Sequence, residues 1–314
     1  MFIAAMNQRL GVGLVGGEFS ARAHVESWTG VREAEVLGVW SANAANAAET
    51  AAHARRLDVG AAKPYPSIAA MIADRAISAL WLCGAADARL EHMEEIADAV
   101  IRAKGKLLAV ASETPLAPTV ADARRVTALA AHAGLKHGYL EHHIFAPSIA
   151  GDKKQLWDQA AHSTGRPHLA RATVSPGRDS RAAFDSLCHG VLVARFLLTE
   201  PGAFLTTLRP LRVTGEITSH SAVITIEFAT PDATSVRAEV SVSQSAGEVD
   251  GHAASNQHYV RAFLGLEEPL LTFEDGFEVV RLLMAAYQSA EEGRTLDYPP
   301  PGLETFVPAV ARVS

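Results

Sequence analysis

The first 140 residues alternate short apolar runs with longer segments of helical periodicity. The apolar runs lie at residues 10–15, 36–40, 79–83 and 107–111. Helical patterns follow them, to about residue 28 and then at 43–57, 91–103 and 120–133. Strands that are buried on both faces are continuous in apolar residues, so this alternation predicts a parallel sheet covered by helices on both sides. We predict a doubly wound α/β domain at residues 1–140.

The second half of the chain has a different pattern. Residues 222–228 and 236–242 alternate apolar with polar side chains, and the turn Thr230-Pro231-Asp232 between them predicts an antiparallel hairpin. Helical patterns at 184–198, 255–264 and 277–292 accompany it. We therefore predict that residues 141–314 form an α+β domain with an open, mainly antiparallel sheet. One face of that sheet should be solvated or covered by a partner.

Composition and charge narrow the class of protein. A chain of 314 residues is long enough for two domains at about 150 residues each. Its net charge of −7 argues against nucleic acid or an anionic membrane as a partner. Two cysteines, Cys83 and Cys188, are too few for a disulfide scaffold, and no segment is apolar for long enough to span a membrane. We expect a cytoplasmic protein, with the pair Lys153-Lys154 solvated.

A glycine-rich stretch ends the first predicted strand. Gly11-Val12-Gly13-Leu14-Val15-Gly16 matches G-x-G-x-x-G, but its first glycines fall inside the strand. The dinucleotide fingerprint belongs after the strand, where backbone N–H groups meet a pyrophosphate. In that register we expect cofactor contacts from Gly16, Gly17, Glu18 and Phe19, with Glu18 adding a negative charge where a glycine is usual. A plain strand–turn–helix without a nucleotide stays open as an alternative.

The end of the second predicted strand bears on the type of cofactor. Ser41 stands where an acidic residue would bind the ribose hydroxyls of NAD, and no arginine follows closely to bind the extra phosphate of NADP. We expect Ser41 to contact the cofactor, and the choice between NAD and NADP stays open.

Several segments resemble one known family. The string Ser112-Glu113-Thr114-Pro115-Leu116-Ala117 resembles the E-K-P-L motif of the glucose–fructose oxidoreductase / inositol dehydrogenase family, Gfo/Idh/MocA. Further segments resemble that family in the same order, at residues 12–24, 137–149, 184–202 and 274–301. The resemblance implies an N-terminal Rossmann domain, and a C-terminal domain whose sheet forms homo-oligomers, either dimers or tetramers.

The resemblance also implies an activity and its residues. Members of the family transfer a hydride between NAD(P) and a hydroxyl or carbonyl of a sugar, polyol or related small molecule. Asp185 and His189 match its Asp-x-x-x-His pair and share one helix face, with His189 as the base and Asp185 as an orienting or substrate contact. The resemblance assigns Glu113 to the cofactor, and we expect Glu141 and His143 to contact the substrate.

One departure from the family pattern favours a second hypothesis. Thr114 replaces the motif lysine, whose positive charge stabilises the alkoxide-like oxygen of the substrate. Loss of one such stabiliser costs about a hundredfold or more in rate. Thr114 remains the expected catalytic residue at this position, but together with Glu18 and Ser41 it favours an alternative function. That alternative is a catalytically degenerate relative that binds or regulates and keeps the fold.

A metal-dependent enzyme is the least supported class. Glu141, His142 and His143 follow a predicted strand, and Cys188 and His189 could approach them. Neighbouring residues on an extended segment point to opposite sides, and the spacing is not that of a zinc motif. We therefore predict no metal site here.

Overall fold

The chain forms two compact units that do not follow the sequence in simple order. The structure is a computed structural model that describes residues 9–16, 24–102, 106–175, 180–218, 221–243 and 250–309. Unit 1 contains Met1–Ala117, Arg124–Leu140 and His252–Phe273, and unit 2 contains Pro118–Ala123, Glu141–Gly251 and Glu274–Ser314. The predicted boundary at residue 140 falls on a division between the units, but His252–Phe273 returns to unit 1.

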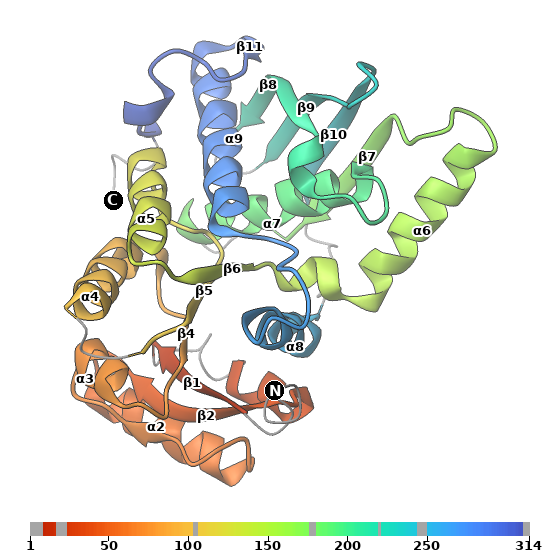
Figure 1. Ribbon diagram of the computed structural model, residues 1–314. Helices are drawn as coiled ribbons and strands as arrows, with labels where there is room; N and C mark the ends of the chain where they lie inside the picture. Colours follow the sequence, from red (N-terminus) through yellow and green to blue (C-terminus); the bar gives the residue numbers. More distant parts are fainter. Residues whose placement is uncertain are drawn as a thin grey trace. The chain divides into compact units, whose positions relative to one another are not determined.

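Unit 1 is built on a six-stranded parallel sheet (Figure 1). Its strands are β1 (Leu10–Val15), β2 (Ala34–Trp40), β3 (Lys63–Pro64), β4 (Ala79–Leu82), β5 (Ala109–Glu113) and β6 (Lys136–Leu140). Their order is β3-β2-β1-β4-β5-β6, and every neighbouring pair is parallel. This confirms the predicted doubly wound Rossmann sheet. The strand order reverses between β1 and β4, and ligands of such sheets bind at this switch point.

Helices connect these strands. They are α2 (Ala44–Arg56), α3 (Ile68–Ala73), α4 (Arg89–Ile101) and α5 (Val120–His132), with short 3-10 turns η2 (Trp28–Gly30) and η3 (Ala86–Ala88). Residues 24–27, just before η2, are also helical. The alanine-rich α2 begins at Asn43, whose side chain accepts a hydrogen bond from the backbone N–H of Ala45 at 2.9 Å. That cap satisfies one of the free donors at the helix start.

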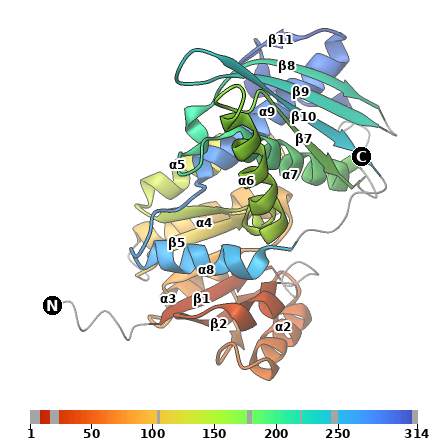
Figure 2. The same ribbon diagram turned by 90° about the vertical axis from the view of Figure 1, so that its right-hand side faces the viewer.

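A helix from late in the sequence completes unit 1. Helix α8 (His252–Phe263) lies against the sheet of unit 1 in both views (Figures 1 and 2). The indole of Trp81 on β4 donates to Asn256 Oδ1 at 2.9 Å, and the hydroxyl of Tyr259 donates to the carbonyl of Tyr139 at 2.7 Å. All four of these residues are buried, so α8 supplies core contacts to unit 1.

Unit 2 contains a five-stranded mixed sheet. Its strands are β7 (Leu169–Val174), β8 (Arg209–Ile217), β9 (Ala222–Ala229), β10 (Ser235–Val242) and β11 (Leu296–Asp297), in the order β11-β8-β9-β10-β7. Only β10 and β7 pair in parallel. The predicted hairpin is therefore confirmed as β9 and β10. Its predicted inward residues Ile224, Ile226 and Phe228 are fully buried.

The helices of unit 2 are α6 (Pro147–Ala161), α7 (Ser180–Leu198) and α9 (Phe273–Glu292), and the 3-10 turns are η4 (His142–Phe145), η5 (Leu205–Thr207) and η6 (Leu303–Thr305). These helices pack on the sheet or, in the case of α6, on another helix, α7. Helix α9 approaches β8 at Gly215, where a Cβ would lie 2.0 Å from the carbonyl oxygen of Ala286. Across the outward face, Arg171 pairs with Glu239 at 2.8 Å. Within the described ranges, the helices lack the combination of length and apolarity that crossing a membrane requires.

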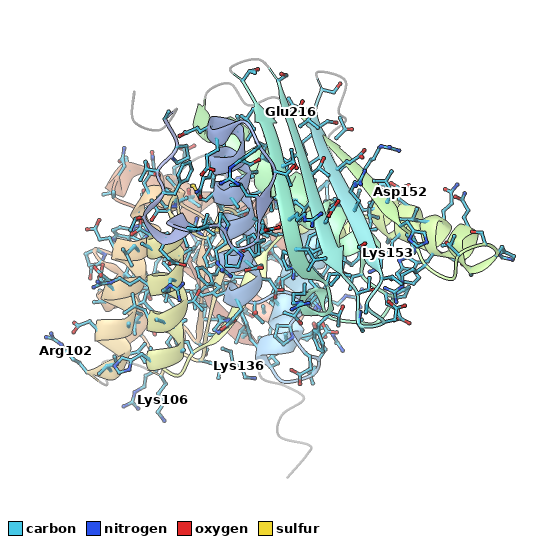
Figure 3. The ribbon with its side chains drawn as sticks, turned by 90° about the horizontal axis from the view of Figure 1, so that it is seen from above. Arg102, Lys106, Lys136, Asp152, Lys153 and Glu216 are labelled. Carbon is cyan, nitrogen blue, oxygen red and sulfur yellow. The ribbon has the colours of Figure 1, made fainter. Side chains whose placement is uncertain are left out.

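Lys153 on α6 corrects the prediction of a solvated pair of lysines (Figure 3). Its side chain is buried, and Nζ lies 3.8 Å from the centroid of the Phe196 ring on α7. Burial lowers the pKa of Lys153 to about 8. Lys154 is exposed and pairs with Asp158. The prediction was wrong for Lys153 because that side of α6 packs on α7.

Candidate functional site

Gly16 marks the switch point of the unit 1 sheet. It follows β1 with φ +114°, and a Cβ there would lie 2.6 Å from the backbone nitrogen of Gly84, which follows β4. The ends of β1 and β4 therefore touch backbone to backbone, an approach that only glycine permits. Gly11 and Gly13 lie inside β1, as expected if the dinucleotide fingerprint begins after this strand and not within it. Gly17, Glu18 and Phe19 lie outside the described residues.

The other predicted cofactor residues lie at the same edge of the sheet. Ser41 follows β2, and its hydroxyl accepts a hydrogen bond from the N–H of Asn43 at 3.2 Å. Glu113 ends β5, and the half-buried Thr114 follows it. In parallel sheets the carboxyl ends of the strands share one edge, so Gly16, Ser41, Glu113 and Thr114 all lie on the edge where such folds bind ligands.

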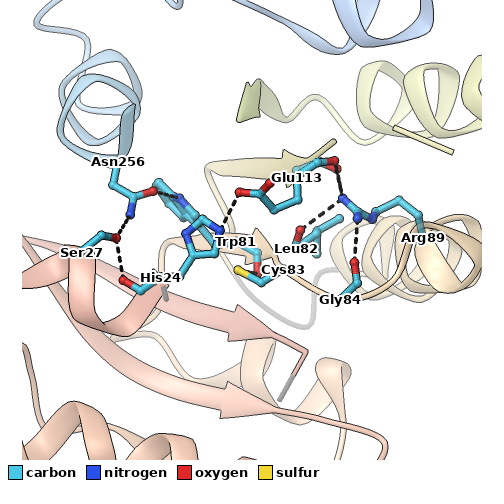
Figure 4. Close-up of polar contacts among 10 residues, drawn as sticks. His24, Ser27, Trp81, Leu82, Cys83, Gly84, Arg89, Glu113 and Asn256 are labelled. Atoms are coloured by element: carbon cyan, nitrogen blue, oxygen red, sulfur yellow. Dashed lines mark hydrogen bonds and ion pairs between the residues drawn. The ribbon is translucent and has the colours of Figure 1, made fainter. Parts of the chain in front are cut away.

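A buried arginine ties two strand ends together at this edge (Figure 4). Arg89, the first residue of α4, is 1% exposed. Its guanidinium donates to the carbonyl oxygens of Leu82 at 3.1 Å, Gly84 at 2.8 Å and Glu113 at 2.9 Å, and also to the hydroxyl of Ser112. Arg89 therefore fixes the ends of β4 and β5 and places a positive charge beside them. The sequence did not predict this role, because no local pattern shows that the Arg89 side chain reaches the carbonyl groups at the ends of β4 and β5.

Glu113 holds a buried histidine. His24, 2% exposed, donates from Nε2 to Glu113 Oε1 at 2.5 Å (Figure 4). Burial alone would lower the pKa of His24, but the neighbouring Cys83 and Glu113 raise it well above its ordinary value. The ring of His252 on α8 lies 5.3 Å from that of His24, centroid to centroid. The sequence predicted no role for His24 or His252.

Unit 2 brings together three of the predicted site residues. Glu141 begins η4, and its Oε1 accepts from the backbone N–H of His143 at 3.1 Å and from His143 Nδ1 at 2.7 Å. Its Oε2 accepts from Nδ1 of His189, on α7, at 2.6 Å. The Glu141 side chain is fully buried, whereas those of His143 and His189 are 23% and 18% exposed. Asp185, half-buried, lies one turn before His189 on α7.

The electrostatics of this group fix which nitrogens can take a proton. Burial alone would raise the pKa of Glu141, but His189 and His143 hold it well below its ordinary value. An ionised carboxylate only accepts hydrogen bonds, so both imidazoles carry a proton on Nδ1. In the neutral imidazoles Nε2 is then the basic nitrogen. Burial raises the pKa of the neighbouring thiol, Cys188, which stays uncharged.

The geometry of the two adjacent histidines corrects one prediction. The segment after β6 is a 3-10 turn and not extended, so the rings of His142 and His143 lie side by side, 4.1 Å apart by centroid. Their predicted opposite orientation is wrong because Glu141 caps that turn. Ligand atoms of Glu141, His143 and His189 lie within 4.8 Å of one another, close enough to hold a metal ion. The geometric argument against a metal therefore no longer applies.

Several solved structures share this fold. GenD2 from gentamicin A biosynthesis, in complex with NAD, is 20% identical, with a TM-score of 0.72 over 93% of this chain and 97% of that chain. Myo-inositol dehydrogenase from Lactobacillus casei, in complex with NAD(H) and myo-inositol, is 18% identical, with a TM-score of 0.71 over 96% and 99%. An oxidoreductase from Agrobacterium radiobacter, in complex with NAD+, L-tartaric acid and magnesium, is 16% identical, with a TM-score of 0.71 over 92% and 98%.

The family assignment comes from the sequence of unit 1. A search of curated proteins found no match. Residues 10–139, which span β1 to β6, match the family described as "Oxidoreductase family, NAD-binding Rossmann fold". This confirms the resemblance seen in the E-K-P-L-like string and the segments around it. Residues 10–139 therefore match the NAD-binding Rossmann domain of the Gfo/Idh/MocA oxidoreductase family.

Proposed function

We propose that this protein transfers a hydride between NAD(P) and a hydroxyl or carbonyl of a sugar, polyol or related small molecule. The family match to an NAD-binding Rossmann domain supports the cofactor class. The solved relatives support the substrate class, since one holds NAD(H) with myo-inositol. The observation that carries the proposal is the buried Glu141 carboxylate on Nδ1 of His189, which prepares a base for a hydroxyl proton.

The described edge of unit 1 fits a dinucleotide. The left-handed Gly16, with no room for a Cβ, lets the backbone turn sharply at the switch point, where a pyrophosphate is held in such folds. Ser41 and Glu113 are the proposed contacts at the ends of β2 and β5, and Gly17, Glu18 and Phe19 remain predicted contacts. When bound, NAD(P) supplies the hydride acceptor or donor.

The proton of the substrate hydroxyl goes to His189. Nε2 accepts it, and the imidazolium that forms keeps its Nδ1–H on the Glu141 carboxylate at 2.6 Å. That carboxylate stabilises the new positive charge and holds the ring in the useful tautomer, as carboxylate–histidine pairs do in other enzymes. Since Glu141 is fully buried and both of its oxygens bind histidines, we assign it a positioning role in place of a substrate contact. Asp185 and the partly exposed His143 remain the proposed substrate contacts.

Thr114 favours a second candidate function. It brings no positive charge to the position of the family lysine, so an alkoxide there would lack one stabilising group. A relative that binds the dinucleotide and regulates or assembles without turnover would carry the same fold and the same Gly16 turn.

Cofactor binding and turnover separate the two candidates. Titration with NADH and NADPH, followed by nicotinamide fluorescence and melting temperature, should show binding of at least one of them. Turnover of a panel of inositols and sugars is then measured for the parent, His189→Asn and the exposed control His132→Asn. We expect His189→Asn to lose about 10²–10⁴-fold in rate with dinucleotide binding kept.

The outcomes of that experiment distinguish the oxidoreductase from the degenerate relative and test the role of His189. No binding of either dinucleotide at millimolar concentration would remove the oxidoreductase proposal. Binding without turnover of any substrate in the panel would favour the degenerate relative. If His189→Asn turns over substrate as fast as the parent and His132→Asn do, His189 is not the base.

A further inference from the structure

The proposed chemistry gives Glu113 a cofactor contact but assigns no role to the two histidines beside it, His24 and His252. His24, Glu113 and His252 come from three distant parts of the chain: a helical turn before η2, the end of β5 and the first residue of α8. One ligand atom from each lies within 4.8 Å of the others. Two imidazoles and one carboxylate form a ligand set that first-row transition metals use in many proteins.

We propose that His24, Glu113 and His252 form a binding site for a divalent transition metal ion of the Zn²⁺ type. His24 presents Nε2 toward Glu113 Oε1, and the ring of His252 stands edge-on to that of His24, at an interplanar angle of 86°. Three protein ligands leave one or more coordination positions for water or a small molecule. Imidazole with carboxylate suits zinc, iron and nickel better than magnesium, which prefers oxygen ligands alone.

Hydrogen bonds around the group hold two of its ligands in place (Figure 4). The hydroxyl of Ser27 donates to the carbonyl of His24 at 2.7 Å, and Asn256 Nδ2 donates to the Ser27 hydroxyl at 2.8 Å. Asn256 lies one turn after His252 on α8, and its Oδ1 accepts from the Trp81 indole at 2.9 Å. This chain ties the turn that carries His24 to the helix that carries His252.

The third ligand is also held by its surroundings. Arg89 donates to the backbone carbonyl of Glu113 at 2.9 Å, which fixes the end of β5. The Cys83 side chain lies beside His24 and interacts with its ring. Such outer partners orient the ligands in metal sites, and their loss typically weakens metal binding about 10–100-fold.

The test compares this group with the Glu141, His143 and His189 group of unit 2. The full chain is stripped of metal with a chelator and titrated with Zn²⁺ by calorimetry and with Co²⁺ by visible absorption. Glu113→Gln and His252→Gln remove proposed ligands, while Glu141→Gln and His143→Gln make the same changes in the group of unit 2. We expect one ion per chain in the parent and in both unit 2 variants, and affinity at least about 100-fold weaker in Glu113→Gln and His252→Gln.

Three results would overturn the proposal. In the first, the parent binds neither Zn²⁺ nor Co²⁺ at micromolar concentration. In the second, Glu113→Gln and His252→Gln bind the metal with unchanged affinity. In the third, metal binding is lost in Glu141→Gln or His143→Gln instead. Circular dichroism checks that each variant is folded. If Glu113→Gln unfolds, the half-exposed His252→Gln decides alone. NADH binding is measured on the parent and on His252→Gln, which changes no proposed cofactor contact, so failure of the metal site and failure of the proposed redox function are seen separately.

Discussion

Replacing Gly16 by alanine should destabilise unit 1 through backbone strain and a clash between backbone atoms together. The backbone at Gly16 has φ +114°, a conformation that strains an L side chain. The new Cβ would also lie 2.6 Å from the nitrogen and 2.8 Å from the Cα of Gly84. Both are backbone atoms, so relief requires the ends of β1 and β4 to move apart.

The expected cost follows from these two effects. A left-handed conformation costs a residue with a side chain about 1–2 kcal/mol. Overpacking against neighbours that cannot turn away adds about 1–3 kcal/mol. Gly16→Ala should therefore lower the free energy of unfolding by about 2–5 kcal/mol. That is a large part of the total free energy of unfolding of a typical protein, which is about 5–15 kcal/mol.

Two other glycines provide matched controls. At Gly134, φ is +65° and a Cβ would meet no atom within 4 Å, so Gly134→Ala should show backbone strain alone, about 1 kcal/mol. At Gly84, the nearest atom to a Cβ is the Cα of Gly16 at 3.7 Å, an ordinary contact, so Gly84→Ala should be nearly neutral.

Urea unfolding of the three variants and NADH titration check the reasoning. Gly16→Ala should be the least stable and should bind the dinucleotide most weakly. If Gly16→Ala is within about 0.5 kcal/mol of the parent, or Gly84→Ala loses as much stability, the close contact between the strand ends is refuted.

Three further changes test other parts of the structure. Glu141→Gln should cost about 1–3 kcal/mol at neutral pH, because it leaves buried imidazole donors poorly paired. Since the pKa of Glu141 lies well below its ordinary 4.5, the stability that the ionised carboxylate contributes is complete above pH 4.5 and is lost as pH falls further. In urea unfolding at pH about 4, the difference in stability between Glu141→Gln and the parent should therefore be smaller than at neutral pH. An unchanged difference would contradict this assignment. Thr114→Lys should raise any polyol turnover about 10–100-fold by supplying a positive charge, whereas Thr114→Val should not; equal rates would show that position 114 does not contact the reacting oxygen. Arg89→Met should lower stability by about 3 kcal/mol or more by leaving three carbonyls without their buried donor, and a loss below about 1 kcal/mol in urea would refute that role.

Strong apolar contrast made much of the fold predictable from the sequence. Leu10–Val15 has the predicted bounds, and the hairpin of β9 and β10 follows the predicted alternation. Strand β7 was missed because its buried residues, Ala170 and Ala172, are too small to contrast with their neighbours. Helix α6 was missed because it carries few large apolar residues, and one side chain that it buries is Lys153.

The candidate site was predictable only in part. His189 and Asp185 were predicted from their resemblance to the family's Asp-x-x-x-His pair, and the spacing of four placed them on one helix face. The turn that brings His143 beside His189 depends on the cap formed by Glu141. His252 was missed because its neighbours in space, His24 and Glu113, are more than a hundred residues away in the sequence, and no local pattern records such a contact.

The return of His252–Phe273 to unit 1 has a consequence for synthesis on the ribosome. Until Asn256 and Tyr259 emerge, the buried indole of Trp81 and the carbonyl of Tyr139 lack their native partners. N-terminal domains usually fold first as the chain is made, but here more than a hundred residues of unit 2 leave the ribosome before unit 1 can close. A fragment that stops at residue 140 is therefore an unfinished domain, because it lacks the buried contacts that α8 makes with Trp81 and Tyr139.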